Sequence, residues 1–165
     1  MPVRVRFFPG QLLTAQDFET EQKYHLEMRR LHNRLLHGLG IVEGLGVSAA
    51  DVDGSTVIVA PGFAVDGLGR EIAVDQPVRI EAGACGQEIC FVTLEYAETA
   101  TDPVPTANGE SQFSRVTEGF SIGIATQDPC HRGTSEALGL ARLIRQGDRW
   151  IIDENYRPII LSAMA

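Results

Sequence analysis

Three histidines, His25, His32 and His37, are the first candidates for chemistry, because imidazole is a common ligand of transition metals. Two ligands on one α-helix converge when they are three or four residues apart, whereas these histidines are seven and five residues apart. On an α-helix His25 and His32 would lie about 10 Å apart along the axis. The spacing therefore favours packing or hydrogen bonding at a helix–sheet or subunit contact over a metal site.

Three cysteines and one more histidine make a second candidate set: Cys85, Cys90, Cys130 and His131. They contain the ligands of a Cys₃His zinc site, but the spacing of Cys85 and Cys90 is loose for zinc, and the adjacent Cys130 and His131 are awkward ligands for one ion. The odd number of cysteines and the lack of an apolar signal sequence favour free or buried thiols in a reducing compartment. Zinc remains the alternative.

Catalytic residues are not indicated. None of the serines is expected to form a nucleophile elbow. The aspartates that could supply paired carboxylates lie beside glycine or proline or at strand ends, where aspartate is favoured by local hydrogen bonding: they are Asp51, Asp53, Asp66 and Asp75. The glycine pairs at 38–40 and 44–46 follow a helix rather than a strand, so they do not make a phosphate cradle. We expect no enzyme, no cofactor and no metal.

The histidines belong to the one long helix that the sequence predicts, within residues 11–38. Thr14 is its expected N-cap, with Asp17 in a capping-box position, and Gly38 its expected stop. An apolar stripe runs along it with helical spacing: Tyr24, Met28, Leu31 and Leu35. We expect this stripe to cover the apolar face of the strands that follow, as a lid on the core.

Short apolar runs separated by glycine-rich turns follow the helix, and they predict an antiparallel sheet structure. The polar residues 99–114 are expected to form a surface loop, and a hairpin is expected over 138–152 with its turn at 145–149. The predicted class is α+β, mainly β, with one long N-terminal helix packed on an antiparallel β-sandwich or open barrel. We expect one domain, with an arm at 1–10, the helix at 11–38, the β-sandwich at 39–158 and a tail at 159–165.

Charge and hydropathy limit the classes of partner that this sequence of 165 residues is expected to bind. The formal net charge of −8 opposes binding to nucleic acid or to an anionic membrane through bulk charge. No apolar run approaches the roughly 20 residues of a membrane-spanning helix. We expect a protein made in the cytoplasm that binds no nucleic acid and does not insert into a membrane.

Several segments together resemble proteins encoded with phage-tail-like contractile injection systems. The resemblance is carried by residues 8–18, 21–24, 29–40, 44–47, 59–72, 96–98, 102–105 and 115–119. The layout of a proline–glycine turn, a long helix, a glycine-led strand and a β-sandwich is also similar to the N-terminal domain of the type VI secretion baseplate subunit. That domain in turn resembles the shoulder domain of phage receptor-binding proteins.

The resemblance implies a non-enzymatic structural or adaptor subunit of a baseplate or tail, incorporated into a phage-like particle. Its implied partners are other baseplate or tail proteins and further copies of itself, with a trimer favoured. The expected partner-binding residues come from the arm, the helix and the C-terminal end: Phe8, Gln11, Arg29, Arg30, His32, Arg34, Tyr156 and Arg157. Charge reversal at Arg30 or Arg34 is expected to disrupt assembly without changing the melting temperature of the monomer.

Two other functions stay open on the sequence. A sandwich with long loops also suits a receptor- or carbohydrate-binding module, and specific glycan binding at residues 99–114 would favour it. A zinc-stabilised or hydrolytic enzyme is a third possibility, which needs bound metal or turnover to support it.

Overall fold

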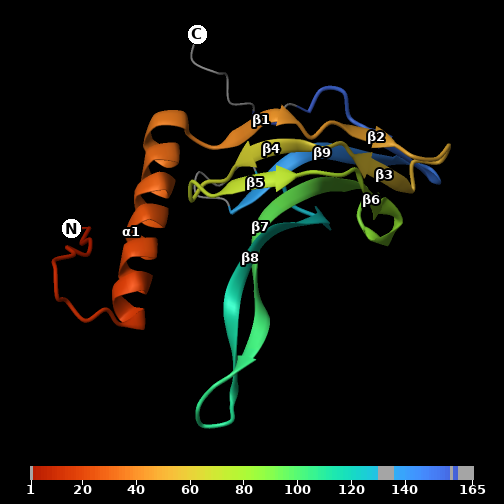
Figure 1. Ribbon diagram of the computed structural model, residues 1–165. Helices are drawn as coiled ribbons and strands as arrows, with labels where there is room; N and C mark the ends of the chain where they lie inside the picture. The colour runs from red at the N-terminus through yellow and green to blue at the C-terminus, as the bar shows by residue number, and fades with distance from the viewer. Residues whose placement is uncertain (1, 130–135, 157, 160–165) are drawn as a thin grey trace.

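The protein forms one helical segment followed by three antiparallel sheets (Figure 1). The structure is a computed structural model, and it describes residues 2–129, 136–156, 158 and 159. Helix α1 spans Ala15–His32 and continues into a π-helical turn, η1, over Asn33–His37. A capping box starts the helix, in which the backbone N–H of Thr14 donates to the Asp17 carboxylate at 2.8 Å.

The strands of each sheet are neighbours in the following orders. The first sheet has the order β1 (Gly40–Gly44), β4 (Gly62–Val65), β5 (Glu71–Val74). The second has β2 (Val47–Ala49), β3 (Thr56–Val59), β6 (Val78–Glu81), with a 3₁₀ turn, η2, at Ala82–Ala84. The third has β10 (Arg149–Ile152), β9 (Ala137–Gln146), β7 (Ile89–Pro105), β8 (Ser111–Ala125).

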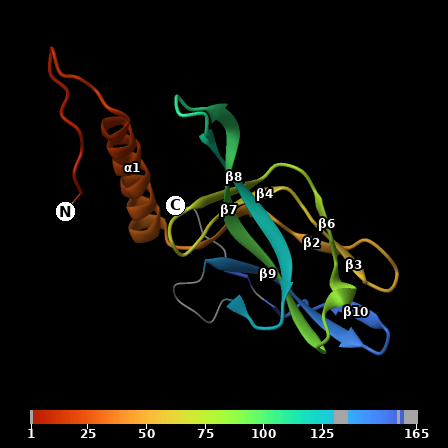
Figure 2. The same cartoon turned by 90° about the horizontal axis from the view of Figure 1, so that it is seen from below.

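One hydrophobic core joins the three sheets. Alternation along the strands supplies it: Val57 and Val59 of β3 are buried, as are Val92 and Leu94 of β7, while the intervening Ile58 is half-exposed. The sheets curl around this core into a half-barrel (Figures 1 and 2). Trp150 belongs to the core. The predicted class, α+β and mainly β, is confirmed.

The expectation that the helix covers the core is wrong. None of the 18 residues of α1, all of them described, is buried, and within the described chain the core and the side chains packed on it begin at Leu39. The helix stands beside the sheets and meets them near its C-terminal end (Figures 1 and 2). The predicted N-cap at Thr14 is confirmed, and the helix begins at Ala15, within the predicted segment 11–38.

The N-terminal arm lies against the apolar stripe of the helix. It leads away from the first turn of α1 and runs back along the side of the helix that faces away from the sheets (Figure 1). The backbone N–H of Val5 donates to the Glu21 carboxylate at 3.3 Å. Pro2 lines shallow grooves together with Tyr24, Met28 and Leu31 of the stripe. The arm therefore lies beside the stripe as far as Leu31, whereas Leu35 at its end is exposed.

Residues 99–114 do not form the predicted loop. They belong to a two-stranded ribbon, the distal part of β7 and β8, which projects beyond the half-barrel (Figure 1). The pairing continues to Pro105 opposite Ser111. A short turn closes the ribbon, where the Thr106 hydroxyl donates to the backbone oxygen of Glu110 at 2.8 Å.

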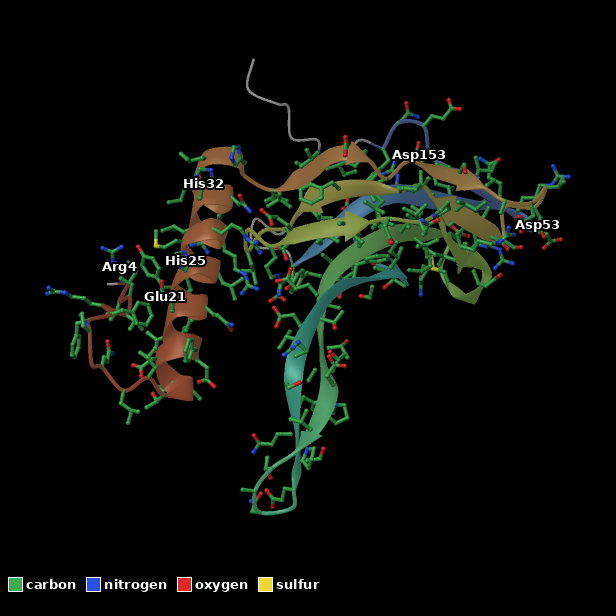
Figure 3. The ribbon with its side chains drawn as sticks, viewed as in Figure 1. Arg4, Glu21, His25, His32, Asp53 and Asp153 are labelled. Carbon is green, nitrogen blue, oxygen red and sulfur yellow. A yellow bond between two sulfur atoms is a disulfide. The ribbon has the colours of Figure 1, made fainter. Side chains whose placement is uncertain are left out.

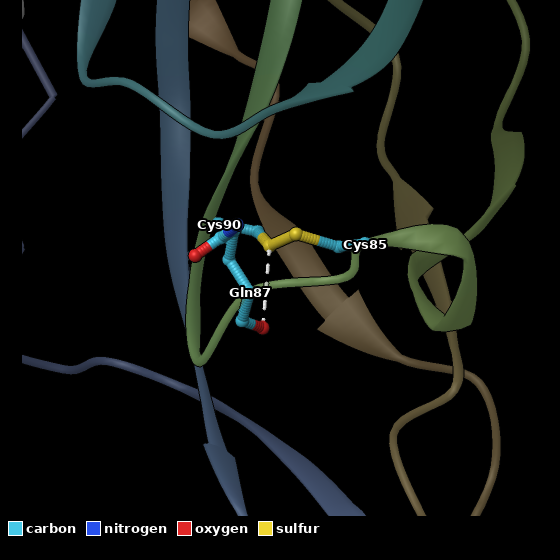
Figure 4. Close-up of a disulfide and its surroundings, with 3 residues drawn as sticks. All are labelled: Cys85, Gln87 and Cys90. Carbon is cyan, nitrogen blue, oxygen red and sulfur yellow. Dashed lines mark hydrogen bonds between the residues drawn. A yellow bond between two sulfur atoms is a disulfide. The ribbon is translucent and has the colours of Figure 1, made fainter.

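The cysteines correct the expectation of free thiols. Cys85 and Cys90 form a disulfide with their Cα atoms 6.6 Å apart, and both side chains lie in the core (Figure 4). Cys130 and His131, the other half of the alternative zinc set, lie outside the described residues.

The predicted C-terminal hairpin is confirmed by the pairing of Trp150 with Arg145 and its neighbours.

Candidate interaction surface

Polar contacts attach the C-terminal end of the helix to the β4–β5 turn. The buried Asn33 side chain donates to the backbone oxygen of Gly69 at 3.0 Å and to the Glu71 carboxylate at 3.1 Å. Gly69 has a φ of +79°, and a Cβ atom there would overlap the backbone oxygen of Arg30. Asn33 therefore holds the helix in a position that only a glycine at residue 69 allows.

Asp66 shapes the same turn. Its side chain is fully buried and accepts from the backbone N–H groups of Leu68 and Arg70 at 2.9 and 2.8 Å. Its second oxygen accepts from Nε of Arg70 at 2.6 Å. These three hydrogen bonds satisfy a buried charge, which would otherwise strongly destabilise the fold.

Two of the predicted partner-binding arginines contact the sheets within the chain. Arg29 lies 3.4 Å from the Glu71 carboxylate, and Arg30 lies 3.1 Å from that of Glu98. Tyr96 donates to the same Glu98 oxygen at 2.8 Å, and the Arg30 guanidinium is 5.8 Å from the centre of the Tyr96 ring. Arg29 and Arg30 therefore help to attach the helix, in addition to any role toward a partner.

The electrostatics of this cluster follow from its contacts. Hydrogen bonding from Tyr96, followed by that from Arg30, holds the pKa of Glu98 below its ordinary value. Burial, with a further contribution from the hydrogen bond to Glu98, raises the pKa of Tyr96. Glu98 is therefore a carboxylate and Tyr96 a neutral hydrogen-bond donor at neutral pH.

The predicted residues Phe8, Gln11 and Arg34 lie on the outer surface of the helical region. Phe8 and Arg34 are exposed, and Gln11 accepts from the backbone N–H of Phe8 at 3.3 Å. Tyr156 lies elsewhere, on the half-barrel, where its hydroxyl donates to Asp128 at 3.2 Å and its ring centre is 5.8 Å from that of Phe91. Arg157 lies outside the described residues.

His32 and His37 come together, although their spacing of five residues does not converge on an α-helix. The Nε2 atoms of the two rings are 3.2 Å apart, and both residues are exposed. The π-helical turn causes this, because the backbone N–H of Gly38 donates to the oxygen of Asn33, five residues earlier, at 2.9 Å. His25 lies apart from them and contacts Glu21 at 3.0 Å (Figure 3).

Exposed apolar side chains gather on two elements, and of these the sequence prediction singled out only Phe8, as a partner-binding residue, and Leu35, as part of the helical stripe. The helical region presents Leu12, Phe18, Leu35 and Leu36, in addition to Phe7 and Phe8 of the arm. The ribbon presents Val104, Phe113 and Val116. Exposed apolar groups in number on two projecting elements are typical of surfaces that bind other proteins. The signal was present in the sequence as apolar residues beyond the single helical stripe.

Other chemistry receives no support from the geometry. Among the described residues no three of the His, Cys, Asp and Glu side chains lie together as metal ligands would. One serine does match the G-x-S-x-G sequence motif of a nucleophile elbow, contrary to the sequence expectation: Ser121 lies between Gly119 and Gly123. It sits in the middle of β8, paired with Glu95, and not in the strand–turn–helix setting that an elbow requires. No described helix is long and apolar enough to cross a bilayer.

No protein-family profile and no curated protein matches the sequence. Solved structures do match the fold. A chain of the type VI secretion system TssK-TssF-TssG baseplate subcomplex, determined by cryo-electron microscopy, superposes with a TM-score of 0.60 at 14% identity, over 96% of this chain and 62% of that chain.

Two further structures of TssK agree. TssK from the type VI secretion system of EAEC, in complex with nanobody nb18, gives a TM-score of 0.56 at 15% identity over 86% of this chain and 54% of that chain. The crystal structure of TssK gives 0.60 at 13% identity over 96% of this chain and 42% of that chain.

The present chain thus spans about half the length of the chains that it matches. At these identities the likeness is one of fold, and it confirms the structural resemblance that the sequence indicated. The chain shares the fold of type VI secretion baseplate proteins over nearly all of its length.

Proposed function

We propose that this protein is a non-enzymatic structural subunit of the baseplate of a phage-tail-like contractile particle. The observation that carries the proposal is the helical segment of α1 and η1, which contributes nothing to the apolar core and yet exposes Phe18, Leu35 and Leu36. A helix of this kind needs a partner to cover it. The shared fold supports baseplate proteins as the class of that partner, because one matching chain comes from a TssK-TssF-TssG baseplate subcomplex.

The proposed contact surface combines two projecting elements. The first is the helical face around Arg34, Leu35 and Leu36, which are exposed at the end of the helical segment. The second is the ribbon, where Phe113 and Val116 are exposed by 63% and 64%. Assembly through these elements, into a homo-oligomer with trimers favoured and with other baseplate proteins, buries apolar surface that the monomer leaves in water.

Arg34→Glu and Leu35→Glu test the helical part of this surface. Both residues are exposed, so the free energy of unfolding should change by no more than about 0.5 kcal/mol. We expect both variants to lose co-purification with sheath, tube and baseplate proteins from the source organism, as identified by mass spectrometry. Light scattering coupled to size-exclusion chromatography reports the oligomeric state of the same samples.

Val52→Glu is the matched control. Val52 is 87% exposed in the connection between β2 and β3, at the end of the half-barrel far from the helix (Figure 1). The control variant should keep every partner of the wild-type protein. A wild-type protein that stays strictly monomeric and never co-purifies with particle components would contradict the proposal.

A receptor- or carbohydrate-binding role gains nothing from the fold, because the long loop expected at 99–114 is a regular ribbon closed by a short turn. A glycan-array screen with the wild-type protein is the direct check of that alternative. Specific binding abolished by shortening the ribbon would replace the baseplate proposal with the receptor-binding one.

A further inference from the structure

The π-helical turn brings His32 and His37 together, and the apolar core makes no use of the pair. Both rings are exposed, so neither fills a place in the core. Their Nε2 atoms nevertheless lie 3.2 Å apart, and their ring centres lie 5.1 Å apart with the planes tilted by 58°. The rings therefore point their distal nitrogens toward a common point rather than stacking face to face.

This geometry matches that of two imidazoles on one metal ion. With Zn–N bonds of about 2.0–2.1 Å in a tetrahedral arrangement, two ligating nitrogens lie about 3.3 Å apart and the ring centres lie about 5 Å apart. The observed separations of 3.2 and 5.1 Å agree with both values. A hydrogen bond from Nε2–H of one ring to Nε2 of the other accounts for the first separation as well. For one ion to bind both nitrogens, the donor ring changes tautomer, with its proton on Nδ1, and the neutral pair releases no net proton.

The backbone fixes this arrangement. The hydrogen bond from the Gly38 N–H to the Asn33 oxygen closes a π-helical turn between the two histidines, and π-helical turns occur frequently at functional sites. Asn33 is buried and tied to Gly69 and Glu71, so the turn is anchored to the sheets. The two rings are thus presented on a rigid support, which lowers the entropy lost when both bind one ion.

We propose that His32 and His37 form a surface binding site for a borderline divalent transition-metal ion, of the class of Zn²⁺, Ni²⁺ and Cu²⁺. Imidazole prefers these ions, whereas Mg²⁺ and Ca²⁺ prefer oxygen ligands. The structure assigns two ligands, since no third His, Cys, Asp or Glu completes a cluster in the described part of the chain. Water or a group from a second protein completes the coordination.

The electrostatics of the position combine opposite contributions, because the basic Arg34 lies in the same turn as His37. The rings lie at the C-terminal end of the helical segment, where unpaired backbone carbonyls carry partial negative charge. The chain as a whole carries a formal net charge of −8. This site is independent of the proposed baseplate role, because both of its assigned ligands come from this chain.

Calorimetric titration of the tag-free protein with ZnCl₂ and with NiCl₂ tests the site. We expect one saturable event per chain in the wild-type protein. His32→Ala and His37→Ala should each weaken binding at least tenfold, because either change leaves a single imidazole. His25→Ala is the matched control, since His25 is exposed on the same helix but contacts Glu21 and not another histidine, and its affinity should equal that of the wild-type protein.

A second measurement needs no variant. Substoichiometric Cu²⁺ added to the ¹⁵N-labelled protein should broaden the imidazole signals of His32 and His37 before that of His25. No saturable binding by the wild-type protein, unchanged affinity in both alanine variants, or first broadening at another histidine would each overturn the proposal.

Discussion

At the scale of single residues, polar side chains near the end of the helix determine how the molecule is put together. Asn33 donates to Gly69, and Arg30 donates to Glu98, so each links the helix to a strand or turn that is distant in the sequence. Asp66 accepts from Arg70 and fixes the β4–β5 turn from within. None of them can be replaced by an apolar residue without leaving its partners unsatisfied. These residues hold the helix and the β4–β5 turn in place.

Replacing Asp66 by alanine should destabilise the protein strongly. The change removes the acceptor of three hydrogen bonds and leaves Arg70 without its buried partner, which costs about 3 kcal/mol of the free energy of unfolding. Urea denaturation followed by Trp150 fluorescence measures this loss. Asp75→Ala, at an exposed aspartate just after β5, should change the same quantity by less than about 0.5 kcal/mol. Equal effects of the two changes would contradict the structural role of Asp66.

Asp51 gives the stability a dependence on acid pH. Hydrogen bonding from Thr56, through its side chain and its backbone N–H, lowers the pKa of Asp51 from 3.8 to about 2. A depressed pKa in the folded state means that the contribution to stability is complete above about pH 4 and is lost as the pH falls toward about 2. The melting temperature of the wild-type protein should therefore fall more steeply over this range than that of Asp51→Asn. Parallel pH profiles would refute this assignment.

At the scale of elements, the sequence predicted where the strands lie better than it predicted which segments pack against each other. Alternation in β3 and β7 and the turn at Gly147 specified local structure directly, because burial on one face requires period two. The helical stripe, in contrast, says only that one face is apolar, and not which segment covers it. Residues 2–14 and the sheets were equally compatible with Tyr24, Met28 and Leu31.

The ribbon and the π-helical turn were missed for specific physical reasons. Pro103 and Pro105 are typical of loops, yet both fit the distal ribbon, where the strands carry no further neighbours. The pairing of His32 with His37 was invisible because α-helical periodicity places residues five apart on different faces.

Of the interaction surface, the exposed Phe8 and Arg34 could be predicted from composition and position. The use of Arg30 within the chain requires the fold, because Glu98 is 68 residues away.

Gly69→Ala should detach the helix from the sheets. A Cβ atom at this position would overlap the Arg30 backbone oxygen, and the φ of +79° is unfavourable for alanine. We expect faster hydrogen exchange at the C-terminal end of α1 and a lower melting temperature. Gly109→Ala is the control, because its φ of +85° carries the same backbone strain, about 1–2 kcal/mol, in open space. Unchanged exchange of the helix amides in Gly69→Ala would contradict the contact.

At the scale of the whole molecule, one core supports everything that projects from it. The three sheets contribute to a single cluster, and β7 crosses from that cluster into the ribbon, with Leu94 buried and residues 98–100 exposed. Stability therefore resides in the half-barrel, whereas the helix and the ribbon depend on it for their position. The disulfide lies in the same cluster.

Reduction of the disulfide should lower the stability of this core moderately. The bond joins residues five apart, and closing so short a loop restricts the unfolded chain by about 2 kcal/mol. Urea unfolding with and without a reducing agent measures the difference. Alkylation of the denatured, unreduced protein should label one of the three cysteines, and labelling of all three would show that the bond does not form.

The separation between the core and the helix has an evolutionary consequence. Because no residue of α1 is buried and the distal ribbon adds no side chain to the core, most substitutions on these two projections leave the folding equilibrium unaltered. The binding partners of such a protein can diversify while the scaffold remains the same.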